Sequence, residues 1–195
     1  MTLNLWIAVA VVTGYLIGSI SPAVYIARFF GVDLYASGSG NPGATNVGRT
    51  LGARWGVLVA AIDIGKGFVP AFAFGILVGE VAGEVAGLAA VLGHITSPYL
   101  RGRGGKGVAT TLGAILGVQP WLAIPVLLGF GLGVLLWNRV GLGAVLGAIV
   151  LALSGVIGWL LGWCDPSDAV FAVLMAGMVL GRHMGNIRGA RAAID

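Results

Sequence analysis

Residues 140–163 read VGLGAVLGAIVLALSGVIGWLLGW, a run that contains no charged side chain. A helix needs about 20 mostly apolar residues to cross a bilayer, and this run is longer than that. The whole chain shares this character, because 58% of its 195 residues are hydrophobic and only 9% are charged. A soluble domain is about 25% charged. We therefore predict an all-α, polytopic membrane helix bundle that forms a single domain over residues 1–195.

Other apolar runs divide the rest of the chain into candidate membrane spans. They cover residues 5–29, 55–78, 81–98, 108–118, 121–137 and 170–180. Together with residues 140–163 they predict about seven crossings; five would result if residues 81–119 did not span fully. No Lys or Arg precedes the first run, as one would in a secretory signal, so we expect a retained helix. Glycines four apart, such as Gly14/Gly18 and Gly113/Gly117, predict close helix packing.

The charged residues alternate along the chain with these spans. Cytoplasmic ends of membrane helices carry an excess of Lys and Arg. Basic residues follow the first, third, fifth and seventh runs, whereas the turns between them carry only acidic residues or no charge. This pattern predicts a multi-pass protein of the cell inner (plasma) membrane with its N-terminus outside and its C-terminus in the cytoplasm. It also explains the net charge of +4. The sequence has no basic helix of the kind that binds nucleic acid, so we expect no nucleic-acid partner.

Three polar segments remain between the runs, and the topology places all three on the cytoplasmic side. The first, residues 37–49, reads SGSGNPGATNVGR. Its Gly, Asn and Pro residues allow tight turns that direct backbone N–H groups at an anion. Arg49 adds a charge suited to bidentate phosphate contact. Hydrogen-bonding groups come from Ser39, Asn41, Thr45 and Asn46. A turn that merely caps the second helix is the alternative.

The second segment, RGRGGKG at residues 101–107, leads directly into an apolar run. A glycine-rich loop at a helix N-terminus favours anions, because unpaired N–H groups and the helix dipole both point at it. Gly104, Gly105 and Gly107 would form the loop, and Lys106 would supply the opposite charge. Positive-inside anchoring is the alternative, and it accounts for Arg101 and Arg103 but not for the glycines around Lys106.

The third segment, GRHMGNIR at residues 181–188, ends the last run. His183 and Asn186 are three apart and would share a face of a continuing helix. Two histidines without nearby carboxylates make a poor metal site, and Cys164 is the only cysteine, so we expect no metal and no disulfide. His94 is more simply structural. Asp63 and Lys66 lie inside a span and predict an ion pair that faces the bundle.

These segments resemble the bacterial membrane acyl-phosphate:glycerol-3-phosphate acyltransferases, the PlsY family. The first motif of that family is matched throughout residues 39–49. Its second motif is matched at Gly93-His94 and at residues 104–110, with Arg103 in place of the first Lys and Pro98 one place late. Its third motif, His-x-x-Asn-Ile-x-Arg, is met at His183, Asn186 and Ile187, with its Arg one place early at Arg188.

The resemblance implies transfer of a fatty acyl group from acyl phosphate to the 1-hydroxyl of glycerol 3-phosphate, giving lysophosphatidic acid and phosphate. Arg49 and Lys106 would bind phosphate, and Ser39, Thr45 and Asn46 would orient substrate. His183 with Asn186 would orient or deprotonate the hydroxyl, unless the phosphate of the substrate accepts the proton. Acyl phosphate is already activated, so no cofactor and no covalent intermediate is expected. The rival interpretation is a small transporter or channel for an anionic solute, but its site would lie near the midplane.

Overall fold

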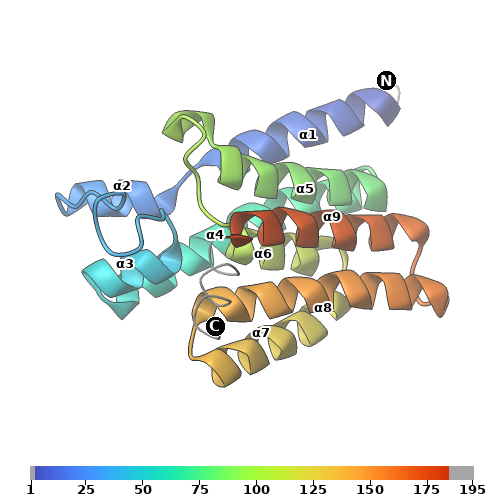
Figure 1. Ribbon diagram of the computed structural model, residues 1–195. Helices are drawn as coiled ribbons and strands as arrows, with labels where there is room; N and C mark the ends of the chain where they lie inside the picture. Colours follow the sequence, from blue (N-terminus) through green and yellow to red (C-terminus); the bar gives the residue numbers. More distant parts are fainter. Residues whose placement is uncertain (1–2, 185–195) are drawn as a thin grey trace. The chain divides into compact units, whose positions relative to one another are not determined.

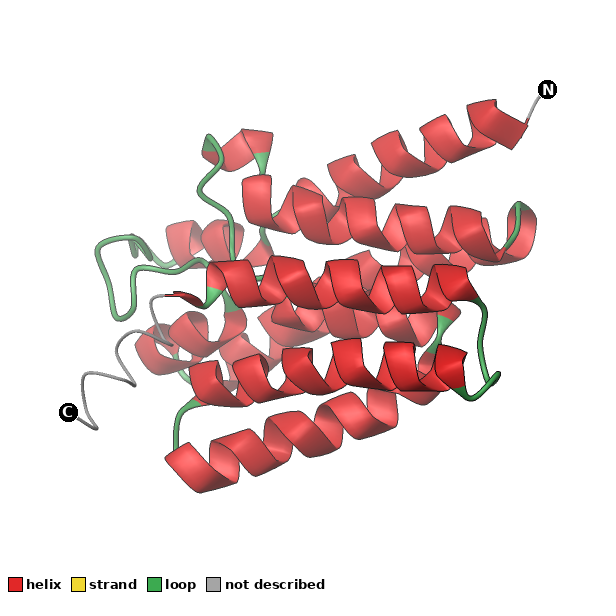
Figure 2. Cartoon of the chain, turned by 45° about the vertical axis from the view of Figure 1, so that its right-hand side comes forward, coloured by secondary structure: helices red, strands yellow, loops and turns green. Residues whose placement is uncertain are grey.

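The computed structural model describes residues 3–184, and every regular element in this range is a helix (Figures 1 and 2). In chain order the elements are α1 (Leu3–Ser19), α2 (Pro22–Phe29), α3 (Ala44–Leu51), α4 (Ala53–Leu77), α5 (Glu80–Thr96), the 3₁₀ turn η1 (Pro98–Leu100), α6 (Val108–Val118), the 3₁₀ turn η2 (Pro120–Leu122), α7 (Ala123–Trp137), α8 (Val140–Leu160) and α9 (Pro166–Arg182). The all-α fold class is thereby confirmed.

Within residues 3–184, four stretches are long and apolar enough to cross a membrane. They are Leu3–Phe29, Ala53–Leu77, Pro120–Trp137 and Val140–Leu160. The other three predicted runs form the shorter helices α5, α6 and α9. Every predicted run is therefore helical in the described part of the chain, and the protein is an integral membrane protein by the length and composition of these helices.

The first predicted span is wrong in one respect, because residues 5–29 do not form one continuous helix. α1 ends at Ser19, and α2 begins at Pro22 after a break at Ile20 and Ser21. Proline has no N–H and is favoured in the first turn of a helix, where none is needed. The hydroxyl of Ser21 accepts a hydrogen bond from the amide of Val24 at 3.4 Å, which caps the new helix.

The chain divides into two compact units, residues 1–118 and 119–195. In the first unit α1 packs on α5, α5 on α4, and α4 on α6. Glycines permit the close approach: a Cβ added to Gly14 or Gly18 would lie 2.3 or 2.0 Å from a carbonyl oxygen of α5. A Cβ added to Gly113 of α6 would lie 1.9 Å from the carbonyl oxygen of Ile64. The predicted packing role of these glycines is confirmed.

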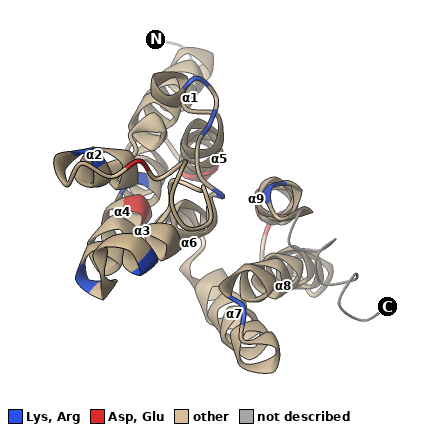
Figure 3. Cartoon of the chain, turned by 60° about the vertical axis from the view of Figure 1, so that its left-hand side comes forward, with Lys and Arg blue, Asp and Glu red and all other residues tan. Residues whose placement is uncertain are grey.

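The same contacts fix the directions of the helices in the first unit. Gly14 meets Ala86 and Gly18 meets Ala90, so α1 and α5 run parallel and end together. Gly83 of α5 lies against Ala71 and Gly75 of α4, whereas Asp63 lies near His94, so α4 runs the opposite way and begins at that end. Figure 3 shows blue segments at this end on α2, on α3 and in the chain after α5. The basic residues of α2, α3, the first turn of α4 and the chain after α5 are Arg28, Arg49, Arg54, Arg101, Arg103 and Lys106.

The second unit consists of the antiparallel pair α7 and α8, with α9 packed on α8. Glycines again permit these two contacts: a Cβ added to Gly133 would lie 2.7 Å from Cα of Gly143, and one added to Gly155 would lie 2.5 Å from Cβ of Ala172. The acidic residues in the described part of this unit lie where α9 begins: the amide of Asp165 donates to the carboxylate of Asp168 at 2.8 Å. The side-chain amide of Gln119 also donates to Asp168. Arg139 and Arg182 belong to the other end, because α8 begins where α9 ends.

Candidate active site

The first polar segment is organised by the side chain of Asn46, which is only 1% exposed. Its oxygen accepts the backbone N–H of Ser39 at 2.9 Å. Its amide nitrogen donates to the carbonyls of Leu34 and Ser37 at 3.2 and 3.0 Å. Both ends of the Asn46 amide group are therefore engaged in holding the loop before it, and the local consequence is a fixed position for Ser39.

Ser39, Thr45 and Arg49 are exposed, in contrast to Asn46. The expected loop becomes helical at Ala44, so that Thr45 and Arg49 lie four apart on one face of α3. Asn41 is partly buried just before this helix. The structure thus presents a serine hydroxyl, a threonine hydroxyl and a guanidinium on the outside of one short segment. These are the groups that a phosphate ligand uses.

The glycine-rich segment lies against the end of α5. The amides of Gly104 and Gly105 donate to the carbonyls of Ile95 and His94, each at 3.1 Å. These two N–H groups therefore hold the loop to α5, which differs from the expectation that they point at an anion. A Cβ at Gly104 would lie 2.0 Å from the carbonyl oxygen of His94, so only glycine fits there. Lys106 is half-buried beside them, and Gly107 has φ of +84° where α6 is about to begin.

Tyr35 joins the first two polar segments, and sequence analysis missed it. Its hydroxyl donates to the carbonyl of Arg103 at 2.8 Å, and the Arg103 guanidinium lies 4.4 Å from the centre of the Tyr35 ring. Burial raises the pKa of the Tyr35 hydroxyl above its usual value, although Arg103 and Arg28 oppose that shift. Nothing in the local pattern distinguishes this tyrosine, because its partner is far away in the sequence.

A pocket of about 640 Å³ opens beside this junction. Its floor is apolar and comes from α2, the turn that follows α2, and the loop after α5. Arg28, Arg101 and Arg103 line it, together with the single carboxylate of Asp33. The charge around the pocket is therefore positive, which would attract an anionic ligand.

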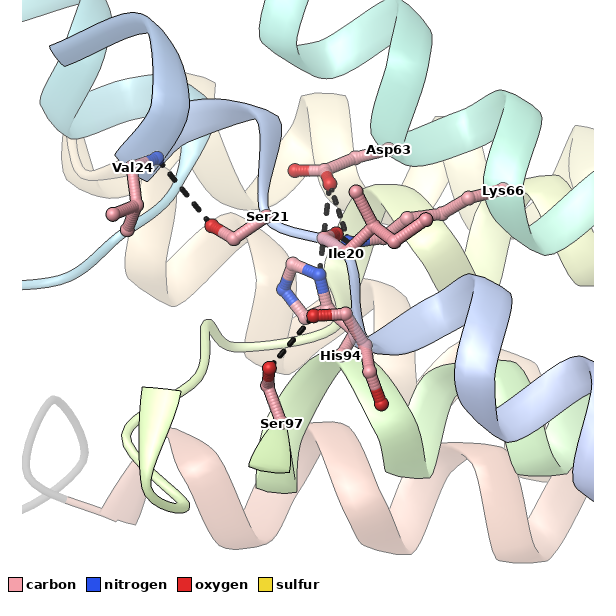
Figure 4. Close-up of polar contacts among 8 residues, drawn as sticks. Ile20, Ser21, Val24, Asp63, Lys66, His94 and Ser97 are labelled. Atoms are coloured by element: carbon pink, nitrogen blue, oxygen red, sulfur yellow. Dashed lines mark hydrogen bonds and ion pairs between the residues drawn. The ribbon is translucent and has the colours of Figure 1, made fainter. Parts of the chain in front are cut away.

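A buried charged cluster joins α4, α5 and the break between α1 and α2 (Figure 4). The Lys66 ammonium lies 2.8 Å from a carboxylate oxygen of Asp63, and the two residues are 7% and 2% exposed. The predicted ion pair is therefore confirmed. Lys66 also donates to the carbonyl of Ile20 at 2.7 Å, at the break between α1 and α2. Nδ1 of His94 lies 3.6 Å from the same Asp63 oxygen, so three spans meet in this cluster.

His183 is the first residue after α9 and is 2% exposed. Its Nδ1 lies 2.7 Å from the carbonyl oxygen of Val179. A carbonyl only accepts, so Nδ1 carries the hydrogen of this contact. Asn186, its predicted companion, lies outside the described residues, as do Ile187 and Arg188.

Comparison with known proteins places this geometry in a family. The family model described as glycerol-3-phosphate acyltransferase matches residues 8–193. The chain belongs to the glycerol-3-phosphate acyltransferase family. Among its relatives, the glycerol-3-phosphate acyltransferase of Geotalea daltonii is 36% identical over 96% of this chain and 95% of its own length. That of Aquifex aeolicus is 39% identical over 91% of each chain.

Solved structures of this acyltransferase family share the fold. A crystal structure of PlsY, an integral membrane glycerol 3-phosphate acyltransferase, in its glycerol 3-phosphate form matches with a TM-score of 0.86 and 36% identity. The match covers 96% of this chain and 92% of that one. A crystal structure of PlsY in its lysophosphatidic acid form matches with a TM-score of 0.83 and 35% identity, over the same shares of both chains. The resemblance to the PlsY family is therefore confirmed.

Proposed function

We propose that this membrane acyltransferase transfers a fatty acyl group from acyl phosphate to the 1-hydroxyl of glycerol 3-phosphate, the first step of phospholipid synthesis. The products are lysophosphatidic acid and inorganic phosphate. Acyltransferase activity on glycerol 3-phosphate follows from the family. The related PlsY has a structure in a glycerol 3-phosphate form and one in a lysophosphatidic acid form, which correspond to the proposed acceptor and the proposed lipid product. Acyl phosphate as the donor is our proposal.

The observation that carries the proposal is the junction of the two polar loops at one end of the first unit. The Tyr35–Arg103 hydrogen bond ties the segment of Ser39 and Arg49 to the loop of Lys106. Both substrates bear a phosphate, and Arg49 and Lys106 supply one cation from each loop. Asn41 and Thr45 add neutral hydrogen-bonding groups. The first N–H groups of α6, next to Gly107, have no partner within the helix and favour an anion there.

Three of the predicted binding residues take a supporting role in this proposal. Asn46 holds Ser39 in place, and Gly104 and Gly105 hold the Lys106 loop against α5. Their polar groups are engaged by the protein, so they act on substrate through the residues that they position. Ser39, exposed at the turn, is the residue that would touch the reacting groups directly.

In the proposed reaction the 1-hydroxyl oxygen attacks the acyl carbonyl carbon, and the bond between that carbon and the phosphate oxygen breaks. Phosphate leaves with the electron pair. The hydroxyl proton passes to the imidazole of His183, with Asn186 orienting the hydroxyl; a substrate phosphate is the alternative acceptor. Because acyl phosphate is activated, positioning and charge stabilisation suffice without a metal, a cofactor or an acyl-enzyme.

We further propose seven crossings, with the N-terminus outside and the active site facing the cytoplasm of the cell inner membrane. In the first unit the arginines and Lys106 lie at one end and Glu80 at the other, and in the described part of the second unit Arg139 and Arg182 lie opposite Asp165 and Asp168, as the positive-inside rule predicts. The family match over residues 8–193 supports one acyltransferase domain over 1–195. The candidate site residues lie at the ends of the helices, whereas the binding site of a transporter would lie near the midplane of the membrane. This placement does not favour the rival interpretation as a transporter.

The purified protein in lipid vesicles, supplied with glycerol 3-phosphate and a long-chain acyl phosphate, tests the donor. We expect phosphate release in a one-to-one ratio with lysophosphatidic acid. Parallel reactions with the acyl-CoA and acyl carrier protein thioesters should give no product. Lysophosphatidic acid from a thioester but none from acyl phosphate would refute the donor while leaving the acyltransferase intact.

A further inference from the structure

His94 contacts the glycine-rich loop through both its backbone and its ring. Its carbonyl oxygen accepts the N–H of Gly105 at 3.1 Å. The ring lies directly over the same residue, since a Cβ added to Gly105 would be 2.2 Å from Nε2 of His94 and 2.8 Å from Cε1. Gly105 is the residue before Lys106. The position of the imidazole therefore sets how closely the loop approaches α5 at the point where Lys106 begins.

The ring of His94 is itself held from the opposite side. Nδ1 faces Asp63 at 3.6 Å, and Asp63 is fixed by Lys66 at 2.8 Å. Lys66 is in turn tied to the carbonyl of Ile20 at 2.7 Å (Figure 4). Next to it, the Ser97 hydroxyl donates to the carbonyl of Ser19 at 2.7 Å. The carbonyls freed where α1 breaks are thus used to anchor α4 and the end of α5.

We propose that His94 is a positioning residue for Lys106, held by the Asp63–Lys66 pair and acting through its contact with Gly105. The ring takes no part in the reaction and touches neither substrate. A cluster that only stabilised the bundle would not need an imidazole against the glycine loop. An ion pair between Asp63 and Lys66 alone would satisfy both charges. The inference rests on the proposed phosphate-binding role of Lys106.

The ring and the glycine allow a test by complementary substitution. Gly105→Ala places a methyl group where Nε2 lies and must displace the loop. His94→Asn keeps a polar nitrogen near Asp63 but lacks the outer half of the ring, which leaves room for that methyl group. Gly65→Ala is the matched control, because a Cβ there, between the two charged residues of α4, meets nothing within 4 Å.

The readout is the Kd for glycerol 3-phosphate, measured by equilibrium binding to the detergent-solubilised full chain, with the thermal midpoint of each variant recorded alongside. Each single variant should weaken binding about tenfold, and the double variant should bind more tightly than Gly105→Ala alone, because the two changes are coupled. Gly65→Ala should bind like the unchanged protein.

Lower thermal midpoints with an unchanged Kd would show a structural role only and overturn the proposal. So would a double variant whose loss is the product of the two single losses. Because binding is measured without turnover, these outcomes are distinct from a failure of the proposed reaction, which appears as absent phosphate release from the unchanged enzyme. If His94→Asn does not fold, Gly105→Ala combined with His94→Ser gives the same comparison, because serine also lacks the outer atoms of the ring.

Discussion

At the scale of single residues, Asn46 and His183 show most clearly that residues of similar polarity and burial can have different roles. Both are buried and polar, and both bond to nearby backbone. Asn46 uses both ends of its amide group in the loop before α3, which leaves it a scaffold role. His183 bonds through Nδ1 to the carbonyl of Val179, and an imidazole, unlike an amide, can accept a proton near neutral pH. On this chemical ground we propose His183 rather than Asn46 for a direct part in the reaction.

Replacing His183 by Asn tests that part. The asparagine amide nitrogen occupies roughly the place of Nδ1 and can still donate to Val179, but no basic nitrogen remains. General acid–base catalysis contributes about 10²- to 10⁴-fold, so we expect kcat to fall within that range while KM for glycerol 3-phosphate stays near its original value. Steady-state kinetics with acyl phosphate measures both constants. An unchanged kcat would assign proton transfer to the substrate phosphate instead.

At the scale of elements, sequence reasoning located the apolar helices well and the short polar elements poorly. The ends of α6 and the start of α8 fall where the apolar runs begin and end, because lipid requires long uncharged helices. The break at Ile20 was missed, since Ser21 and Pro22 lie inside an apolar run and the freed carbonyl is satisfied by Lys66 from a distant helix. The Tyr35–Arg103 contact is equally long-range, and no local pattern predicts such a partner.

The ion pair in α4 gives a prediction at this scale. Removing one member of a buried pair leaves a charge without its partner and costs about 3–5 kcal/mol, so Asp63→Asn and Lys66→Met should each lower the thermal midpoint markedly. Asp63→Asn combined with Lys66→Met removes both charges and should be more stable than either single variant. It should remain below the unchanged protein, because the carbonyl of Ile20 loses its donor.

Thermal unfolding in detergent, followed by circular dichroism, measures these differences. Gly65→Ala serves as the control on the same helix and should leave the midpoint nearly unchanged. A double variant that loses as much as the two single variants together would mean that the charges act independently, each with other partners.

At the scale of the whole molecule, the placement of charge supports the proposed orientation of the chain in the membrane. In the first unit Glu80 lies at the turn between α4 and α5, away from the arginine-bearing loops. In the second unit Asp165 and Asp168 begin α9, whereas Arg139 lies at the opposite turn. Two units with the same polarity of charge are what a common cytoplasmic face requires, because Lys and Arg are retained on that side. Charge is readable from the sequence, so this topology can be proposed without knowledge of the contacts between helices.

Single cysteines in a Cys164→Ser background test this orientation in intact cells. Leu77→Cys and Trp163→Cys replace exposed residues at the ends that we assign to the outside, one in each unit. Ala36→Cys and Trp137→Cys replace exposed residues at the basic ends. A membrane-impermeant maleimide should label the first two in intact cells and the second two only after the membrane is opened. Denatured samples must label at all four positions, so that a missing signal reflects sidedness rather than burial. Labelling of Ala36→Cys in intact cells would place the loops that we propose to bind phosphate outside, where a cytoplasmic acyl phosphate could not reach them.

Agreement with the expected labelling in one unit but not in the other would instead change the number of crossings between the two labelled units, because each crossing reverses the side on which the next loop lies.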